Sequence, residues 1–144
     1  MNRLTKSSVV AFILVLFSCE DNNANEEPLP EFGSISGTIT FIGTWPSDPD
    51  SISEVLITLD TNYPPMGPPA GFKYVTRADL ENNIYSYSFG ELSFRDYDAV
   101  TVTYWPEGYV SAGTNYSLIG SHIETINVTQ DEADITIDIE ATFN

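Results

Sequence analysis

The 144-residue sequence contains a single cysteine, Cys19, and a single histidine, His122. One cysteine cannot form an intrachain disulfide bond, so the fold has to be stabilised by its hydrophobic core alone. A Ser-His-Asp triad would have to use His122, which has no nucleophile motif near it. A structural zinc site needs several Cys or His ligands, which one cysteine and one histidine do not supply. The chain is therefore predicted to be neither an enzyme nor a cofactor-binding protein.

Basic residues are also scarce, because five Lys and Arg stand against 21 Asp and Glu, for a formal net charge of −16 at pH 7. A surface of this sign repels nucleic acid phosphates and anionic lipid headgroups, so nucleic acid is excluded as a partner. The sequence also lacks a long apolar run. The longest, residues 9–17, has nine residues, whereas a helix needs about 20 to span a bilayer.

This apolar run follows two basic residues, Arg3 and Lys6, an arrangement typical of an export signal. The run ends in Leu16-Phe17-Ser18-Cys19, which resembles a bacterial lipobox, in which a lipid is attached to the cysteine and the chain is cut before it. An ordinary secretory cleavage site would need a small residue in place of the leucine. The resemblance therefore implies a signal peptide over residues 1–18 and a lipidated Cys19 that attaches the protein to a membrane.

Residues 20–32 contain five acidic residues, two prolines and no basic residue. Such a segment cannot bury enough apolar surface to fold, so residues 19–32 are predicted to be a lipidated, disordered tether. Acidic residues directly after the lipid cysteine resemble the sorting signals of Bacteroidetes-type outer-membrane lipoproteins that reach the cell surface, although an ordinary solvated spacer has the same composition. Removal of the signal peptide leaves three basic residues against 21 acidic ones, a formal charge of −18.

From Gly33 onward, apolar and polar residues alternate with a period of two. The pattern is clearest in residues 33–41, 55–60, 85–89, 100–104 and 135–143. One apolar and one polar face are typical of antiparallel sheets, and the length allows one core. We therefore predict that residues 33–144 form one all-β domain, an antiparallel β-sandwich of about seven strands with a prealbumin-like or Ig-like topology.

The segments between these strands contain proline and glycine. Residues 61–72 hold four of the nine prolines, which cannot donate hydrogen bonds to a sheet, so a long stiff loop is predicted there. Residues 107–121 contain three glycines and are predicted to be irregular. Short strands are expected over residues 73–76 and 123–128, and a single helical turn over residues 77–83.

Three segments resemble the carboxypeptidase-regulatory-like domains: the first strand Gly33-x-Ile35-x-Gly37-x-Ile39-x-Phe41, the aromatic strand Tyr85-Ser-Tyr-Ser-Phe89, and the closing strand Ile135-Thr-Ile-Asp-Ile139. These domains are transthyretin-like sandwiches of seven strands and are frequent in lipoproteins of Bacteroidetes. One departure is Ser93-Phe94-Arg95-Asp96, where the family usually places proline and glycine, so this turn must be built differently. The resemblance implies a non-catalytic module.

Pairs of acidic residues in predicted loops are candidate calcium ligands, since Ca²⁺ prefers oxygen ligands. The candidates are Asp96, Asp98, Asp131 and Asp134. Two carboxylates per loop fall short of the roughly six to eight ligands of Ca²⁺, and none has EF-hand spacing, so no metal site is predicted. Separately, Asp50-Ser51-Ile52 resembles the acceptor of Bacteroidetes O-glycosylation, which makes Ser51 a candidate modified residue.

Aromatic and apolar residues in loops are the candidate binding residues, because exposed rings stack on sugar faces or anchor protein interfaces. The candidates are Tyr63, Met66 and Phe72 in the proline-rich loop, together with Trp45 and Trp105, while Tyr109 and Tyr116 also fall in or beside loops. We predict that the loop is the main contact surface, with a tryptophan beside it if the strand order brings them to the same end. Two alternatives stay open: the loop plugs one end of the sandwich, and the tryptophans cap its ends.

These features predict a non-catalytic β-sandwich module that is lipid-anchored in a bacterial outer membrane, either at the cell surface or facing the periplasm. Its partner is expected to be a glycan or an envelope protein. The alternatives are a structural or assembly subunit of an outer-membrane complex and, third in order, a hydrolase. A glycosidase would need two carboxylates about 5–9 Å apart across a cleft, which a small sandwich with short loops does not readily provide.

Overall fold

The computed structural model describes residues 28–46, 52–111 and 113–143, so Cys19 and Ser51 lie outside the described residues. The described chain forms ten strands and one 3₁₀ turn, η1 (Arg77–Asp79). The strands are β1 (Gly33–Ile42), β2 (Glu54–Asp60), β3 (Gly71–Val75), β4 (Ile84–Leu92), β5 (Arg95–Tyr97), β6 (Ala99–Trp105), β7 (Ser117–His122), β8 (Ile126–Val128), β9 (Asp134–Thr136) and β10 (Ile139–Thr142). Within these ranges, no helix is long and apolar enough to cross a membrane. The all-β prediction is confirmed, with ten strands in place of about seven.

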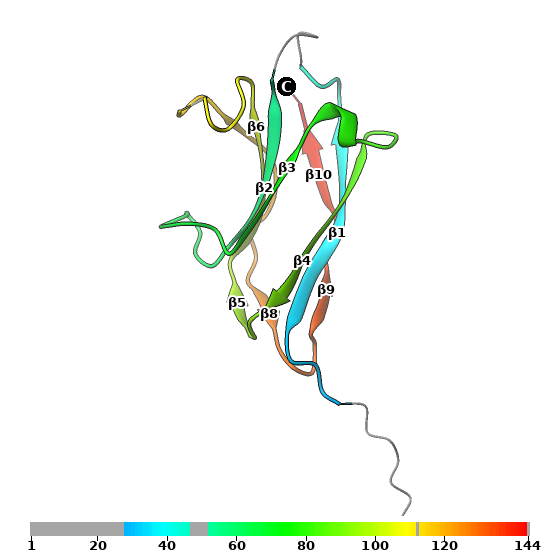
Figure 1. Ribbon diagram of the computed structural model, residues 1–144, viewed down its shortest axis with the longest axis vertical. Helices are drawn as coiled ribbons and strands as arrows, with labels where there is room; N and C mark the ends of the chain where they lie inside the picture. Colours follow the sequence, from blue (N-terminus) through cyan, green and yellow to red (C-terminus); the bar gives the residue numbers. More distant parts are fainter. Residues whose placement is uncertain (1–27, 47–51, 112, 144) are drawn as a thin grey trace, which may run out of the picture.

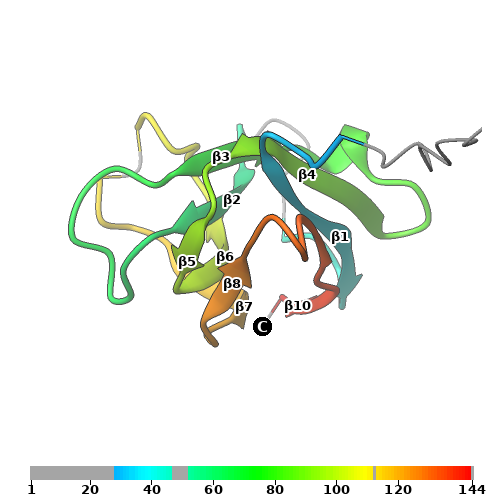
Figure 2. The ribbon, with the colours of Figure 1, turned by 90° about the horizontal axis from the view of Figure 1, so that it is seen from below.

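The strands form two packed sheets, seen side by side in Figure 1 and from below in Figure 2. The first sheet has the order β10-β1-β4, with β9 also paired to β1, and the second has the order β3-β2-β6-β7. A two-stranded ribbon of β5 and β8 lies toward the end where the described chain begins (Figure 1). The predicted β-sandwich is therefore confirmed.

The core between the sheets is built from the predicted inward positions. Its largest fully buried side chains, each less than 2% exposed, are Ile35, Ile39, Val55, Ile57, Leu59, Val75, Val100, Val102 and Val128. Complete burial of an aliphatic side chain of this size contributes roughly 1.5–3 kcal/mol. The period of two therefore identifies the core face of β1, β2 and β6 correctly.

The closing strand differs from its prediction in direction and continuity. It is divided into β9 and β10, and both pair parallel to β1 rather than antiparallel to a neighbour. The division falls at Ile137, whose carbonyl accepts a hydrogen bond from the Tyr87 hydroxyl at 2.8 Å, and at Asp138, whose Oδ1 accepts one from the Thr38 amide at 2.8 Å. Alternation fixes which side chains point inward but carries no information on strand direction, so the antiparallel prediction is wrong here.

Two strands, β5 and β7, lie where the sequence predicts a turn and an irregular segment. β7 contains Gly120, where a Cβ would lie 2.7 Å from the Glu140 carbonyl oxygen, so this glycine permits the close approach of β10. β5 pairs with β8, and the Tyr97 hydroxyl donates to the Ser93 carbonyl at 3.1 Å. This hydrogen bond closes the turn that lacks the usual proline and glycine.

Two long connections shape the second sheet. The 61–70 loop joins β2 to β3, and the 106–116 loop, whose residue 112 is not described, joins β6 to β7. Because β2 and β6 are antiparallel, the two loops leave opposite ends of the sheet. Both project on the side away from β1 and β4 (Figures 1 and 2). The loops therefore flank the same outer face.

Candidate functional site

The outer face of the β3-β2-β6-β7 sheet is partly covered, although such a face usually meets solvent. Four of its outward side chains are almost completely buried, with exposed fractions of 6% for Leu56, 4% for Asp60, 6% for Thr101 and 7% for Trp105. Leu56 and Trp105 form an apolar cluster of their own, separate from the main core. Residues of the 61–70 and 106–116 loops line the same face, which is therefore a groove.

The groove has a volume of about 370 Å³ and a floor formed by β2 and β6. Glu54 and Asp60 are six residue steps apart on β2, so the floor extends about 20 Å along the strands. The thirteen lining residues are Leu56, Thr58, Asp60, Tyr63, Pro65, Gly67, Pro69, Thr101, Thr103, Trp105, Tyr109, Tyr116 and Leu118. A concave, largely apolar lining with a few polar groups is typical of ligand sites.

At one end of the groove three rings pack on one another. Trp105 stacks on Tyr116 with 4.5 Å between ring centroids and 22° between ring planes, and Tyr109 meets Trp105 edge-on at 4.9 Å. The Trp105 indole N–H donates to Thr103 Oγ1 at 2.8 Å, and the Tyr109 amide donates to Glu54 Oε2 at 2.9 Å. Tyr109 and Tyr116 remain 42% and 52% exposed. These three rings, the aromatic end, therefore form a fixed platform with accessible faces.

The row of ring contacts continues onto β3. Tyr74 lies 5.7 Å from Tyr109 between ring centroids, and Phe72 lies 5.5 Å from Tyr74. The register pairs Tyr74 with Leu56 and Phe72 with Thr58, which places both rings on the outer face of the sheet. The sequence prediction missed Tyr74. The sequence feature that could have identified Tyr74 is a pair of aromatic residues on either side of a lysine in an edge strand.

At the other end of the groove, which we call the polar end, Asp60 lies beside two threonine hydroxyls. Thr58 Oγ1 donates to Asp60 Oδ2 at 2.8 Å and lies 2.7 Å from Thr101 Oγ1. Burial raises the pKa of Asp60 above its ordinary value, and the hydrogen bond from Thr58 opposes part of that rise. This end can accept hydrogen bonds from ligand donors. Asp60 is the one carboxylate among the lining residues, whereas glycoside hydrolysis ordinarily uses two.

The structure brings together only some of the predicted binding residues. Tyr63 and Trp105 both line the groove. Met66 is 87% exposed and lines a neighbouring hollow, which shares Asp60 and Gly67 with the groove. Phe72 belongs to β3 and is 54% exposed. Because Met66 and Phe72 are exposed, the 61–70 loop does not plug the end of the sandwich.

Trp45 lies in the core and not in the groove. It is 6% exposed, and its ring lies 5.2 Å from that of Phe143 and 6.0 Å from that of Phe41. Its indole N–H donates to Ser53 Oγ at 2.9 Å, which satisfies the one polar group of the buried ring. This packing agrees with the capping interpretation of Trp45, and its role as a binding residue stays a prediction.

The calcium candidates do not converge. In the part of the chain that the structure describes, no three His, Cys, Asp or Glu residues lie close enough to hold a metal ion. Asp96 Oδ1 accepts a hydrogen bond from an asparagine on β8, and Asp134 Oδ1 accepts one from the Ser34 hydroxyl at 2.7 Å. These two carboxylates therefore join neighbouring strands, and Asp98 and Asp131 belong to no cluster either.

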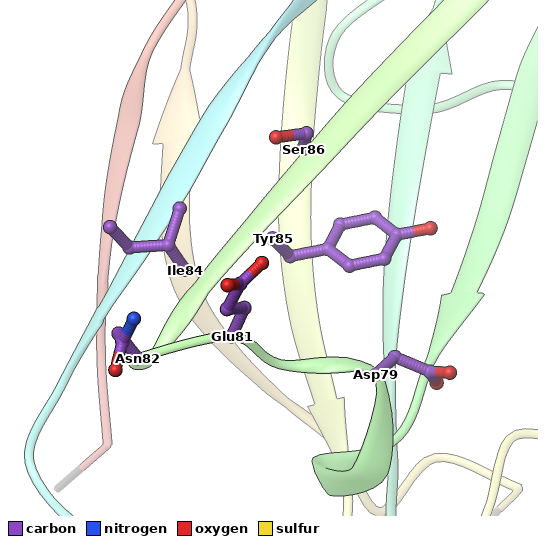
Figure 3. A pocket seen from close by; sticks show the side chains of 6 residues that line it. All are labelled: Asp79, Glu81, Asn82, Ile84, Tyr85 and Ser86. Atoms are coloured by element: carbon purple, nitrogen blue, oxygen red, sulfur yellow. The ribbon is translucent and has the colours of Figure 1, made fainter.

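A second hollow, of about 400 Å³, lies beside η1 and β4 in the first sheet (Figure 3). The carboxylates of Asp79 and Glu81 point in different directions in this view. Asp79 already accepts hydrogen bonds from the Thr76 amide and hydroxyl, each at 2.7 Å, and Tyr85 packs against the hydrophobic core. Tyr85 is the one ring that lines this hollow and is partly buried, whereas the groove has two rings that are more than 40% exposed, so the groove is the stronger candidate site.

No protein-family model, no curated protein and no solved structure matches the chain. The likeness to carboxypeptidase-regulatory-like domains and to lipoproteins stays a prediction from the sequence. Function has therefore to be inferred from the groove itself.

Proposed function

We propose that this chain is a non-enzymatic, lipid-anchored module of a bacterial outer membrane that binds a glycan in the groove over the β3-β2-β6-β7 sheet. The observation that carries this proposal is an outer sheet face hollowed between two loops, with ring faces at one end and hydroxyl groups along the floor. Attachment through Cys19 rests on the lipobox resemblance of residues 16–19.

The chemistry of the groove suits a carbohydrate. Sugar rings have apolar faces, which stack on aromatic side chains, and hydroxyl groups, which both donate and accept hydrogen bonds. Tyr109 and Tyr116 offer exposed rings for stacking. Thr58, Thr101 and Thr103 offer hydroxyl oxygens as acceptors, since their own hydrogens are donated within the sheet. The lining residues include no Lys or Arg and only one carboxylate, so a weakly charged ligand is favoured.

Both walls of the groove are restrained before a ligand binds. The 61–70 loop contains four prolines, and the 106–116 loop is tied to β2 through the hydrogen bond between the Tyr109 amide and Glu54. A site whose walls are already ordered loses less conformational entropy on binding than a flexible one. This restraint supports recognition of a ligand by shape and stacking.

The position of the groove is compatible with an anchor at the N-terminus. In Figure 1 the described chain begins at one end of the sandwich, and the 106–116 loop lies toward the opposite end. A tether of the thirteen residues 20–32 would add a root-mean-square span of about 20 Å. The aromatic end would then face away from the membrane, toward the glycans of the envelope.

Binding of the mature, detergent-extracted protein to an array of glycans and peptidoglycan fragments tests the proposal. We expect saccharide binding that Tyr116→Ser weakens by about tenfold, because a stacking face is lost. Phe32→Ser is the matched control, since Phe32 is 50% exposed, against 52% for Tyr116, and lies outside the groove. No saccharide binding by the unmodified chain would refute the glycan proposal.

A subunit that assembles with other envelope proteins is the second candidate. Val110 and Leu118, which are 93% and 47% exposed, lie in the 106–116 loop and at the start of β7. Exposed apolar side chains grouped beside aromatic ones are typical of protein interfaces. Stable co-purification with envelope proteins, lost in Val110→Ser and Leu118→Ser, together with no glycan binding, would favour this function.

A further inference from the structure

We propose that Asp60 is a specificity-determining residue of the groove, whose carboxylate accepts a hydrogen bond from a hydroxyl of a neutral saccharide held beside Thr58 and Thr101. This inference rests on the proposed function of the groove as a glycan site. It adds the class of saccharide and the residue that selects it.

The first observation is a buried carboxylate with an unused acceptor atom. Asp60 is 4% exposed and lines the groove. Its Oδ2 accepts the hydrogen bond from Thr58 Oγ1 at 2.8 Å, whereas its Oδ1 accepts none from any described residue. Among the described residues no buried side-chain nitrogen or oxygen lacks a hydrogen-bond partner, so Oδ1 reaches solvent. A ligand hydroxyl that displaces water can therefore donate a hydrogen bond to this oxygen.

The second observation is that the polar end is held in place from several directions. Asp60 pairs with Ala99 on β6, and its carbonyl accepts a hydrogen bond from the Asp98 amide at 2.9 Å. Thr58 pairs with Thr101 across the same two strands, and their hydroxyl oxygens lie 2.7 Å apart. A ligand thus meets a carboxylate and two hydroxyls that are already positioned, which lowers the entropy lost on binding.

The charge around Asp60 selects a neutral ligand over a charged one. The chain has 21 acidic residues, yet only one of the thirteen lining residues is acidic and none is Lys or Arg. A site for a basic peptide would gather several carboxylates, and a site for an acidic sugar would supply a base. A buried single carboxylate beside hydroxyls instead matches the donor groups of an uncharged sugar.

The two ends of the groove are suited to different chemical groups of one ligand. The aromatic end needs an apolar ring face, and the polar end, about 20 Å away along β2, needs a hydroxyl donor. A chain of linked sugar units presents both along its length. We therefore expect neutral oligosaccharides to bind more tightly than single sugars.

The experiment measures binding of the mature, detergent-extracted protein to neutral gluco-, manno- and xylo-oligosaccharides. Uronate oligosaccharides and a lysine-rich peptide serve as competing probes. We expect Asp60→Asn to weaken binding of the preferred neutral oligosaccharide about tenfold or more, because hydrogen bonds to a charged acceptor are stronger than those to an amide. Its melting temperature should be unchanged or higher, since a desolvated charge is removed. A merely structural role for Asp60 would lower the melting temperature.

The controls separate this assignment from the proposed function. Glu140→Gln makes the same charge change on the outer face of the other sheet and should leave binding unchanged. Thr101→Val should weaken binding, and it tests the polar end even if Asp60→Asn does not fold. If no saccharide binds the unmodified chain, the proposed function fails. If Tyr116→Ser weakens binding but Asp60→Asn and Thr101→Val do not, only the role of the polar end is refuted. Preference for the uronates or the peptide would refute the neutral class.

Discussion

The two sheets of this sandwich follow the same alternating pattern but present different outer faces. On the sheet of β1 and β4, the outward residues Ser36 and Thr38 pair with Ser88 and Ser86, and this hydroxyl-rich face stays open to solvent. On the sheet of β2 and β6, the outward residues include Leu56, which is as buried as parts of the core. Strand pattern alone therefore does not decide whether an outer face becomes a site.

The connections account for the difference. On the open sheet, β4 begins at a two-residue turn in which Asn82 and Asn83 have φ of 52° and 61° and the flanking residues hydrogen-bond to each other. Asparagine tolerates this left-handed conformation, so the short connection of residues 76–83 from β3 can turn into β4 within two residues. On the covered sheet, the 61–70 and 106–116 loops are long enough to fold beside the outer face. The strands supply the core, and the loops turn one face into a groove.

The largest expected effect comes from placing a charge on each outer face. Leu56→Asp should lower the free energy of unfolding by about 3–5 kcal/mol, because the carboxylate would be buried without a partner. Ser88→Asp, on the exposed outer face of β4, should change it by less than about 1 kcal/mol. Urea denaturation measures both. Equal effects would mean that the outer face of β2 is not covered as described.

The second effect concerns two glycines of the open sheet. A Cβ on Gly37 would lie 1.9 Å from the Ile137 carbonyl oxygen, so Gly37→Ala should force the closing strand away from β1 and cost about 1–3 kcal/mol. A Cβ on Gly90 would meet nothing within 4 Å, so Gly90→Ala should be neutral or slightly stabilising. Thermal unfolding separates the two variants, and an undisturbed Gly37→Ala would contradict the close approach of Ile137 to β1.

These comparisons also show what the sequence could and could not predict. Alternation identifies Ile35 and Ile57 as core residues because the side-chain period belongs to each strand by itself. Strand direction, the role of Gly120 beside β10, and the approach of Tyr74 to the 106–116 loop depend on residues distant in sequence, so no local pattern contains them. One local signal was present: Leu56 occupies a polar-face position of its strand, which indicates that something covers that face.

The third effect concerns one carboxylate from each face. Burial raises the folded-state pKa of Asp60 above its ordinary 3.8. The contribution of protonated Asp60 to the free energy of unfolding is therefore present below pH 3.8 and is lost as the pH rises through the raised pKa. The hydrogen bonds from Thr38 lower the pKa of Asp138 below 3.8. The contribution of its carboxylate to the free energy of unfolding is therefore present above pH 3.8 and is lost as the pH falls through the lowered pKa.

The two asparagine variants should therefore change stability in opposite directions. At pH 7, Asp60→Asn should raise the free energy of unfolding and Asp138→Asn should lower it, and both differences should shrink near pH 3. Chemical denaturation at the two pH values measures them against the unmodified chain. The same sign for both variants at pH 7 would contradict the contrast between the covered and open faces.

The smallest expected effect lies within one loop. Tyr63 lines the groove, whereas Met66 is 87% exposed and lines a hollow that shares only Asp60 and Gly67 with the groove. Met66→Ser should therefore change neither the melting temperature nor saccharide binding. Tyr63→Ser should leave the fold intact but weaken binding severalfold, because one wall of the groove loses its aromatic ring. Isothermal titration with the preferred oligosaccharide compares the two. If Met66→Ser weakened binding as much as Tyr63→Ser, the ligand would contact the tip of the loop, and the covered face of the sheet would not be the binding surface.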